Sequence, residues 1–455
     1  MTGGMTLMKS CRLVAIMVLA VYSARDNSAG AVSPPTVLDT TIIVTGIDFP
    51  TTMAFIGHCD FLVLEQRTGK VIRVKLPGPS LSTVLQLNSI TGSEQGMLGI
   101  ALHPDFTNKG WVYFYHTDSE RNCNQIVRYW WDGNSFISRG FLISFPTNSS
   151  HNGGIIAFGP DGKLYAVVGD TRRASKTTNN ATAPLLNIAQ IVRLNDDGSV
   201  PSDNPFTEPG WEKIYAYGIR NSFGFAFDPQ TGCLWDTENG PASYDEINIV
   251  RPGFNSGWDR LMGPLSRIDG DPGSLYEVPR SSYADPVFSW AFTIAPTAIR
   301  FLNSPRFSAN LRNNCIVGNV STNKLFRFPL NEDRDSFVLG GNLADGVMDF
   351  EDEDDGQLLF ASGFGLVTDL QIGPDGYLYV VSHTFRGVFK IRPRFPMGDI
   401  NRDQNVTDDD MPLFFDLLLG NSADPLQIAQ ADFDGDGIVT GLDIQGFVDS
   451  LRLPN

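Results

Sequence analysis

Gly159-Pro-Asp-Gly-Lys-Leu-Tyr-Ala-Val-Val-Gly-Asp170 and Gly373-Pro-Asp-Gly-Tyr-Leu-Tyr-Val-Val-Ser-His-Thr384 are two copies of one pattern, a Pro-Asp-Gly turn followed by an apolar strand. A third copy runs from Asp228 to Glu238, and looser versions occur at 61–75, 103–116 and 313–328. A tight turn before β-branched and aromatic residues is typical of a β-hairpin. About six such copies predict an all-β fold, a six-bladed β-propeller with long loops between blades, over residues 37–392.

The composition fits a large β-domain and argues against nucleic acid as a partner. The chain has 455 residues, of which 45 are Gly, 31 are Phe and only 19% are charged. Such a chain suits one large β-domain with many tight turns and an appendage, and it does not suit a disordered or coiled-coil protein. The net charge of −17 disfavours nucleic acid, because phosphate binding needs clustered Lys and Arg.

The N-terminus has the features of an export signal. Lys9 and Arg12 precede an apolar run from Leu13 to Val21, and small residues follow. This pattern predicts a signal peptide over residues 1–31 and a protein that is secreted or extracytoplasmic, in the periplasm or at the cell surface. The apolar run is too short to cross a bilayer, so we expect no membrane span.

Four cysteines lie beyond this signal, and their spacing fits no zinc motif. They are Cys59, Cys123, Cys233 and Cys315. In an oxidising compartment they favour disulfides, with buried free thiols as the alternative.

Two acidic loops follow one another within residues 398–455. Oxygen-bearing groups recur at alternating positions with a carboxylate at position 12, which is the spacing that Ca²⁺ needs for its oxygen ligands. The predicted metal ligands are Asp399, Asn401, Asp403, Asn405 and Asp410 in the first loop, and Asp432, Asp434, Asp436, Ile438 (through its carbonyl) and Asp443 in the second.

Position 6 of each loop must make a sharp turn. Gly437 supplies it in the second loop, whereas Gln404 stands there in the first, so we expect the first loop to bind Ca²⁺ more weakly. Apolar runs over 411–419 and 444–451 predict two short helices after the loops. This paired arrangement resembles a small α-helical dockerin type I module. The resemblance implies a cohesin-like domain or another cell-envelope anchor as partner.

Four further motifs each stand next to a strand-like run of the propeller region. They are Glu94-Gln-Gly-Met-Leu-Gly99, His151-Asn-Gly-Gly154, Gly218-Ile-Arg-Asn-Ser-Phe-Gly224 and Glu238-Asn-Gly-Pro241. In this order they resemble the soluble quinoprotein glucose dehydrogenase and sorbosone dehydrogenase family, which includes hedgehog-interacting-protein-like chains. The resemblance covers residues 37–392 and implies ligand-binding loops around a central funnel.

The resemblance implies a role for each motif. His151 matches the general base that takes the proton of a sugar hydroxyl, and an imidazole with a pKa near ~6.5 suits that task. Arg220 would polarise a carbonyl of the cofactor pyrroloquinoline quinone, with Asn221 beside it as a hydrogen-bond donor. Gln95 matches a glutamine that reaches both the base and the cofactor.

The cofactor's Ca²⁺ would bind the carbonyl oxygens of Gly240 and Pro241, because uncharged oxygens suit Ca²⁺ when the ligand itself is anionic. The chain also departs from the family. Ser150 precedes the predicted base where quinone-dependent members have Asp. A lysine is missing from 318–321 and two arginines are missing from 366–368, so three cations that would neutralise cofactor carboxylates are absent.

Together these patterns predict a secreted sugar dehydrogenase that oxidises a sugar hydroxyl, as from an aldose to a lactone. Calcium-bound pyrroloquinoline quinone would be the cofactor, an external acceptor would take the electrons, and the dockerin-like tail would tether the protein. The missing cations favour the alternative of a non-catalytic propeller that binds a carbohydrate or protein. A calcium-dependent lactonase is a third alternative, although no Glu and Asn cluster for its metal stands out in the sequence.

Overall fold

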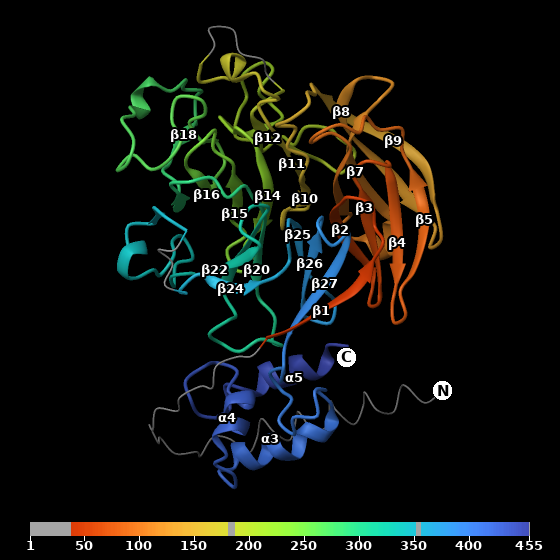
Figure 1. Ribbon diagram of the computed structural model, residues 1–455, viewed down its shortest axis with the longest axis vertical. Coiled ribbons are helices and arrows are strands. Elements are labelled where there is room, and N and C mark those ends of the chain that lie inside the picture. Colours follow the sequence, from red (N-terminus) through yellow and green to blue (C-terminus); the bar gives the residue numbers. More distant parts are fainter. Residues whose placement is uncertain (1–37, 181–186, 352–355, 455) are drawn as a thin grey trace.

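The computed structural model describes residues 38–180, 187–351 and 356–454, and the predicted signal peptide lies outside these ranges. The described residues form six β-sheets that follow one another around a ring (Figure 1). Neighbouring sheets contact each other mainly through the strand that comes first in each sheet along the chain. This arrangement is a mainly β, propeller-type fold, as the repeated turn pattern predicts.

The bounds of the strands follow, sheet by sheet. The first sheet contains β2 (Pro50–Gly57), β3 (Asp60–Glu65), β4 (Lys70–Lys75) and β5 (Ser80–Gln86). The second contains β6 (Met97–Leu102), β7 (Trp111–Asp118), β8 (Cys123–Trp131) and β9 (Phe136–Phe145). The third contains β10 (Ile156–Phe158), β11 (Leu164–Val168), β12 (Gln190–Leu194), β13 (Ile214–Tyr217), β17 (Phe254–Asn255) and β18 (Ser282–Tyr283). The fourth contains β14 (Ser222–Phe227), β15 (Leu234–Glu238), β16 (Asp245–Val250), β19 (Phe288–Trp290) and β23 (Val347–Met348). The fifth contains β20 (Pro296–Leu302), β21 (Asn314–Asn319), β22 (Lys324–Pro329) and β24 (Leu359–Ser362). The last contains β25 (Val367–Ile372), β26 (Leu378–Ser382), β27 (Gly387–Pro393) and β1 (Leu38–Thr45). The loops contain the short helices α2 (Phe106–Lys109), η1 (Ala174–Lys176), η2 (Pro272–Ser274) and η3 (Gly341–Leu343).

The last sheet joins the two ends of the propeller. Its outer strand β1 comes from the N-terminal side and pairs antiparallel with β27, so that the ring closes through main-chain hydrogen bonds. The two nearly identical turns make equivalent hairpins, in which Gly159 N donates to Lys163 O and Gly373 N donates to Tyr377 O, both at 2.9 Å. The repeat read from the sequence is therefore a structural repeat.

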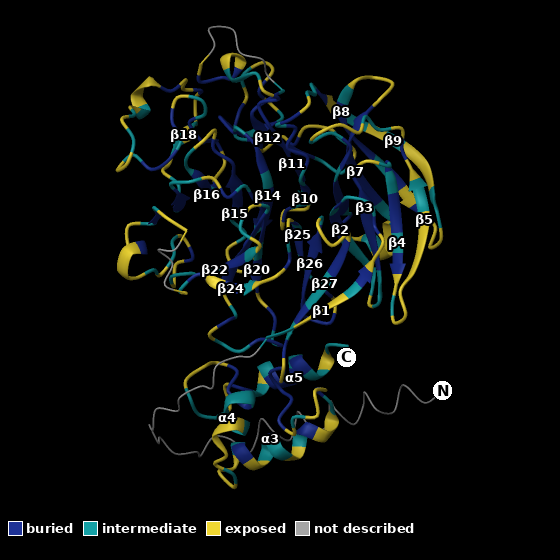
Figure 2. Ribbon diagram, viewed as in Figure 1, coloured by how far each residue is buried: buried dark blue, intermediate teal, exposed yellow. Residues whose placement is uncertain are grey.

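The core lies between adjacent sheets (Figure 2). Alternating side chains of each strand face the neighbouring sheet, so the buried clusters continue around the ring. Trp235 and Trp290 are both wholly buried in the cluster that joins the sheets of β14–β16 and β20–β22. These clusters fix the relative positions of the loops at the ends of the strands.

A separate module follows β27. It contains η4 (Asp408–Asp410), α3 (Met411–Leu418), α4 (Pro425–Ala431) and α5 (Ile444–Arg452), and it has its own apolar core. Phe414 of α3 stacks on Phe447 of α5 with ring centroids 4.1 Å apart. The helices α3 and α5 are the two that the apolar runs predict, and α4 is an additional helix that the sequence analysis did not single out.

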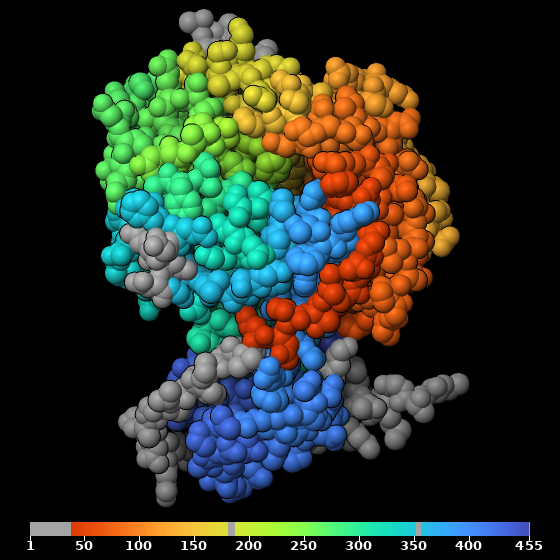
Figure 3. Space-filling view, viewed as in Figure 1, coloured from red at the N-terminus to blue at the C-terminus, as the bar shows by residue number. Residues whose placement is uncertain are grey.

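The C-terminal module is docked on the propeller (Figures 1 and 3). Arg306 and Arg312, both from the loop between β20 and β21, make the contact. The fully buried Arg306 donates through Nη2 to the carbonyls of Leu453 at 3.1 Å and Pro454 at 3.3 Å. Arg312 donates to the carbonyl of Phe433 in the second acidic loop.

The cysteines correct one expectation. Cys59, Cys123, Cys233 and Cys315 are all free thiols, so the disulfides favoured by the sequence analysis are not formed, and the alternative of buried free thiols holds for Cys315 alone. Only Cys315 is fully buried, and burial raises the pKa of its thiol. None of the helices in the described part of the chain is long and apolar enough to cross a bilayer.

Candidate active site

A cavity of about 460 Å³ opens at the centre of the ring, and we call it the central cavity. It lies at the N-terminal ends of the first strands of the sheets, where β2, β6, β10, β14, β20 and β25 begin. Loops that are far apart in the sequence meet there, as the sequence analysis expects of a propeller. Its polar and charged lining residues include Glu94, His151, Arg220, Asn221, Asn239, Asp245 and His383.

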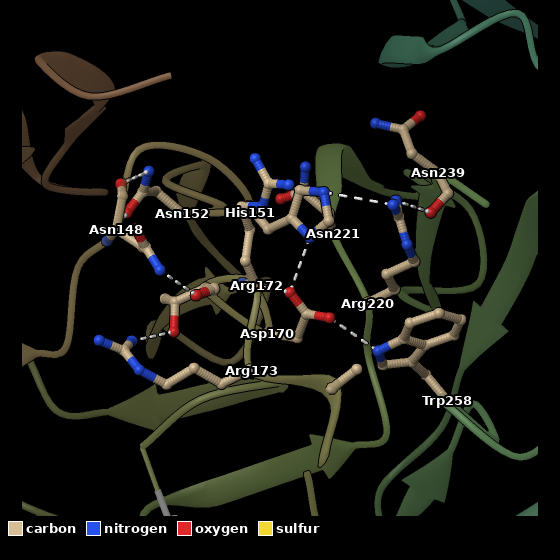
Figure 4. Close-up of polar contacts among 12 residues, drawn as sticks. Asn148, His151, Asn152, Asp170, Arg172, Arg173, Arg220, Asn221, Asn239 and Trp258 are labelled. Carbon is tan, nitrogen blue, oxygen red and sulfur yellow. Dashed lines mark hydrogen bonds and ion pairs between the residues drawn. The ribbon is translucent and has the colours of Figure 1, made fainter. Parts of the chain in front are cut away.

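His151 is held in a defined orientation (Figure 4). Its Nδ1 lies 2.7 Å from Oδ1 of Asp170, and its Nε2 lies 3.2 Å from Nη2 of Arg220. Because a guanidinium only donates hydrogen bonds, both contacts are hydrogen bonds only if Nδ1 carries the proton and Nε2 is the acceptor. A carboxylate behind Nδ1 also stabilises the imidazolium that forms when Nε2 takes a proton. The geometry therefore suits a general base.

Asp170 is the residue that the sequence analysis missed. It is 1% exposed, its Oδ2 accepts from Nε1 of Trp258 at 2.9 Å, and its Oδ1 accepts from the backbone N of Arg172 at 2.7 Å. The carboxylate partner of His151 thus comes from the loop after β11, and not from position 150, which Ser150 occupies. A usable signal existed, since Asp170 ends the strand repeat at the funnel end.

Arg220 carries its charge next to the base. Its Nη1 donates to the carbonyl of Asn239 at 2.7 Å, and its guanidinium lies 5.3 Å from the ring centroid of Trp258. Burial lowers the pKa of Arg220, and nearby carboxylates, Asp170 first among them, oppose this effect. Its buried Nε has no hydrogen-bond partner among the described residues, so the protein does not fully satisfy this cation.

Glu94 stands where the sequence analysis expected Gln95. The Gln95 side chain donates to Oγ1 of Thr147 at 3.1 Å and does not line the central cavity. Glu94 does line it, and its Oε2 accepts from the backbone N of His151 at 2.5 Å and lies 3.4 Å from Nδ2 of Asn221. The geometry therefore does not support Gln95 as the residue that reaches the base. Both residues lie in a tight turn, in which the N of Gln95 donates to the carbonyl of Gly92 at 2.8 Å.

Asn221 joins two loops of the site. It is 2% exposed, and its Oδ1 accepts from the backbone N of Gly153 at 3.2 Å. Its amide group also lies near Glu94, as described above. Asn221 thus lies beside Arg220 on the cavity wall, as predicted, and it keeps the His151 loop in place.

Gly240 and Pro241 also line the central cavity. The turn is fixed by Asp245, whose Oδ1 accepts from the N of Gly240 at 2.7 Å while its Oδ2 accepts from the N atoms of Ile294 and Ala295. Burial raises the pKa of the Asp245 carboxyl, and these backbone donors oppose the effect. The turn has the uncharged carbonyl oxygens that suit a Ca²⁺ ion with an anionic ligand.

Three carboxyl groups are buried in the sheet next to this turn, on β15 and β16. Glu238 accepts from the N of Arg220 at 2.5 Å and from Oγ of Ser256 at 2.6 Å. Oδ1 of Asp236 is buried and has no hydrogen-bond partner among the described residues. Burial raises the pKa of Asp236 to about 7 and that of Glu246 to about 8, and repulsion from neighbouring carboxylates adds to the shift of Glu246.

The two acidic loops of the C-terminal module have matching geometry. In the first, Asp410 accepts from the N atoms of Ile400 at 2.7 Å and Asn401 at 3.0 Å, and Asp399 accepts from the N of Gln404 at 3.0 Å. The carboxylates at positions 1 and 12 are both wholly buried, which, together with repulsion from neighbouring carboxylates, raises the pKa of Asp399 to about 6.

The second loop repeats this pattern. Asp443 accepts from the N atoms of Phe433 at 2.6 Å and Asp434 at 3.1 Å, and Asp432 accepts from the N of Gly437 at 3.0 Å. Carboxylate oxygens of Asp432, Asp434 and Asp436 lie within 4.8 Å of one another. In the first loop Asp399, Asn401 and Asp403 occupy the equivalent positions, and Asp403 N donates to Asn401 Oδ1. At the next ligand position the two loops make the same contact, since Asn405 N donates to Asp403 and Ile438 N donates to Asp436.

Comparison with known proteins identifies the propeller. Residues 47–390 match the family described as Glucose / Sorbosone dehydrogenase. The chain belongs to this family. It is 29% identical over 384 residues to the aldose sugar dehydrogenase YliI of Escherichia coli, and the alignment covers 79% of this chain and 94% of that protein. It is 31% identical over 254 residues to quinoprotein glucose dehydrogenase B of Acinetobacter calcoaceticus, covering 50% of this chain and 53% of that protein.

Solved structures agree with this assignment. A crystal structure from Thermus thermophilus, described as an oxidoreductase (glucose dehydrogenase), superposes with a TM-score of 0.63 at 28% identity, over 78% of this chain and 99% of that one. The family match ends at residue 390, so the C-terminal module lies outside it.

The donor set of the central cavity fits one side of a quinone cofactor. A quinone carbonyl is an acceptor, and the guanidinium of Arg220, which only donates hydrogen bonds, lines the same cavity. The carbonyl oxygens of the Gly240–Pro241 turn suit the accompanying Ca²⁺, and His151 lies next to Arg220. The reactive side of a calcium-bound quinone is therefore matched by residues of this chain.

Proposed function

We propose that this protein is a sugar dehydrogenase that oxidises a sugar hydroxyl, aldose to lactone, with calcium-bound pyrroloquinoline quinone and an external electron acceptor. The observation that carries the proposal is the set Asp170–His151–Arg220, in which a carboxylate, an imidazole and a guanidinium are in line at 2.7 and 3.2 Å on the wall of the central cavity. Family membership supports the substrate class.

Each residue of the site has a separate role in the proposed oxidation. Nε2 of His151 takes the proton of the sugar hydroxyl, while Asp170 holds the ring and stabilises its positive charge. Arg220 and Asn221 would hold the quinone carbonyl, and the Gly240–Pro241 turn would hold Ca²⁺. When bound, the quinone would supply the acceptor for the hydride that leaves the same carbon. Arg220 must release Nε2 of His151 before the base can act, and a quinone oxygen offers it an alternative partner.

The test compares His151→Gln with Asp170→Asn. We expect His151→Gln to lower dye-linked oxidation of aldoses by about 100-fold or more while quinone binding stays within a few fold, because the base acts in the transition state. Asp170→Asn should lower kcat less and shift its pH profile. Thr147→Ser, a conservative change at the edge of the site, is the control. A native, calcium-loaded protein that oxidises no aldose in the presence of the quinone would refute the proposal.

A non-catalytic binding propeller is the second candidate, and one observation favours it. Nη2 of Arg220 donates a hydrogen bond to Nε2 of His151, so this nitrogen cannot accept a proton from a substrate while that hydrogen bond persists. In this case titration calorimetry would detect sugar binding by the native protein without turnover, and the His151→Gln variant would bind the sugar as well as the native protein does.

We further propose that the six sheets are the six blades of the propeller, that the protein is exported through its N-terminal signal, and that the C-terminal module binds Ca²⁺ and tethers the enzyme in the manner of a dockerin. The matching hydrogen bonds of the two acidic loops support calcium binding. Retention of the full-length protein on a cohesin or envelope fraction, reversed by chelation, would test the tether.

A further inference from the structure

One wall of the central cavity carries no charge. Thr297, Val320, Leu366 and Thr368 line this wall, which we call the neutral wall. Among all described residues that line the cavity, Arg220 is the single Lys or Arg, and Glu94 and Asp245 add carboxylates. The side chains that surround a bound ligand are therefore acidic or neutral everywhere except at Arg220 and the histidines.

The cations nearest to the neutral wall in sequence are engaged elsewhere. Lys324 pairs with Glu351 at 3.2 Å. Arg300 donates to the carbonyl of Leu370 at 2.7 Å and lies 3.8 Å from Asp369. These partners fix both cations, and neither residue lines the cavity.

Two other arginines that could have replaced them also have partners elsewhere in the protein. Arg386 pairs with Asp48 at 2.9 Å on the surface. Arg306 is buried against the C-terminal module, at the end of β20 that lies away from the cavity. A negative charge placed against Val320 or Leu366 would thus gain no cationic partner from the residues that line the cavity.

We infer that the central cavity selects a calcium-bound quinone whose edge toward the neutral wall is uncharged, and that it discriminates against a tricarboxylate there. The inference rests on the proposed function and refines it: pyrroloquinoline quinone would be held through its reactive side alone, and more weakly than a quinone with the same reactive side and an uncharged opposite edge. Pyrroloquinoline quinone carries three carboxylates, and Ca²⁺ with Arg220 can neutralise those on the reactive side only. Each remaining carboxylate without a charged partner lowers affinity by about 10-fold. Val320, Leu366 and Thr368 are therefore residues that determine cofactor specificity.

The test is a binding measurement that needs no turnover. Trp258 lies 5.3 Å from Arg220 at the cavity, so quenching of tryptophan fluorescence reports a bound quinone. The full-length, calcium-loaded protein is titrated with pyrroloquinoline quinone and with an ester in which the carboxylates on the reactive side stay free and those toward the neutral wall are methylated. We expect the ester to bind at least about 10-fold more tightly.

Charge-adding variants sharpen the test. Leu366→Arg combined with Thr368→Arg should reverse the preference in favour of the triacid by about 10-fold or more. Leu359→Arg, on the exposed outer strand β24, adds charge away from the cavity and is the control. Thermal melting of each variant verifies that it is folded.

Three results would overturn the inference: a native protein that binds the triacid more tightly than the ester, a double variant that leaves the preference unchanged, or a native protein that binds neither quinone. The proposed function fails separately. If the ester binds as expected and no aldose is oxidised, the dehydrogenase is refuted and the selectivity stands.

Discussion

In the central cavity His151, Asp170 and Arg220 come from different loops and partner one another, whereas in the C-terminal module the second acidic loop gathers three carboxylates and contains no Lys or Arg. The cation that faces the second loop is Arg312, which belongs to the propeller. The cavity is preorganised by groups of opposite charge, and the module gains its counter-charge from outside. From this difference we expect the cavity to fold ready for a ligand, and the module to depend on calcium and on its docking partner.

The difference predicts first that the module can be unfolded alone. Asp432→Ala combined with Asp436→Ala removes two of the three clustered carboxylates of the second loop, so calcium can no longer organise it. We expect calorimetry of the full-length protein to show loss of a calcium-dependent transition, with the propeller transition unchanged. Asp449→Ala, an exposed acid of α5 outside both loops, is the control. A double variant whose module still melts cooperatively with calcium would show that the loops do not stabilise it through the ion.

The buried carboxyls of β15 and β16 extend the comparison to pH. The pKa values of Asp236 and Glu246 are raised to about 7 and about 8, above the value near ~4 of an unfolded chain. The folded state therefore holds protons that the unfolded state releases, so the stability that these two carboxyls contribute is full below about pH 4 and is lost as pH rises toward 8. Denaturant unfolding at a series of pH values measures this slope.

Asp236→Asn is the matched variant, because the amide oxygen can still accept from Oγ of Ser222. It should flatten the pH dependence by removing one of the titrating groups. A native protein that is as stable at pH 8 as at pH 5 in chelator would show that these carboxyls do not titrate as their burial predicts.

Docking is the next point of comparison. Arg312→Ala removes the donor to Phe433 and the positive charge beside the second loop, a charged hydrogen bond of about 1.5–3 kcal/mol. We expect the module to become protease-sensitive and to swing away from the propeller in small-angle scattering, most clearly in chelator. Arg452→Ala, which is exposed, is the control of equal charge. If the module of Arg312→Ala stays docked without calcium, Arg306 alone holds it.

The sequence predicted the fold better than the site, because the signals for the fold are local in the sequence and the contacts of the site are not. Pro-Asp-Gly turns and alternating strands are local signals, so the hairpins at Gly159 and Gly373 could be read directly. Asp170 lies 19 residues from His151, and only the pairing of β10 with β11 brings them together. The choice between Glu94 and Gln95 depends on which side chain of a tight turn meets the cavity, and no local sequence signal specifies that.

The docked module could not have been predicted, because neither Arg306 nor Arg312 belongs to a motif. The free cysteines likewise depend on distances between blades that no spacing in the sequence reveals. The missing cations of the neutral wall were visible in the sequence. The structure adds that Lys324 and Arg300 are held by other partners and do not replace them.

The smallest expected effect is a difference in calcium affinity between the two acidic loops. Position 6 has left-handed backbone in both, with φ of +72° at Gln404 and +89° at Gly437. A residue with a Cβ pays about 1 kcal/mol there, and glycine does not. Gln404→Gly should therefore tighten calcium binding by the first loop about 5-fold, and Gly437→Gln should weaken the second by a similar factor. The hydrogen bond from Arg392 to the Gln404 side chain is exposed and its loss costs little. Calcium titration of the full-length protein resolves both sites, and equal affinities in the native protein would mean that backbone strain does not set the difference between the loops.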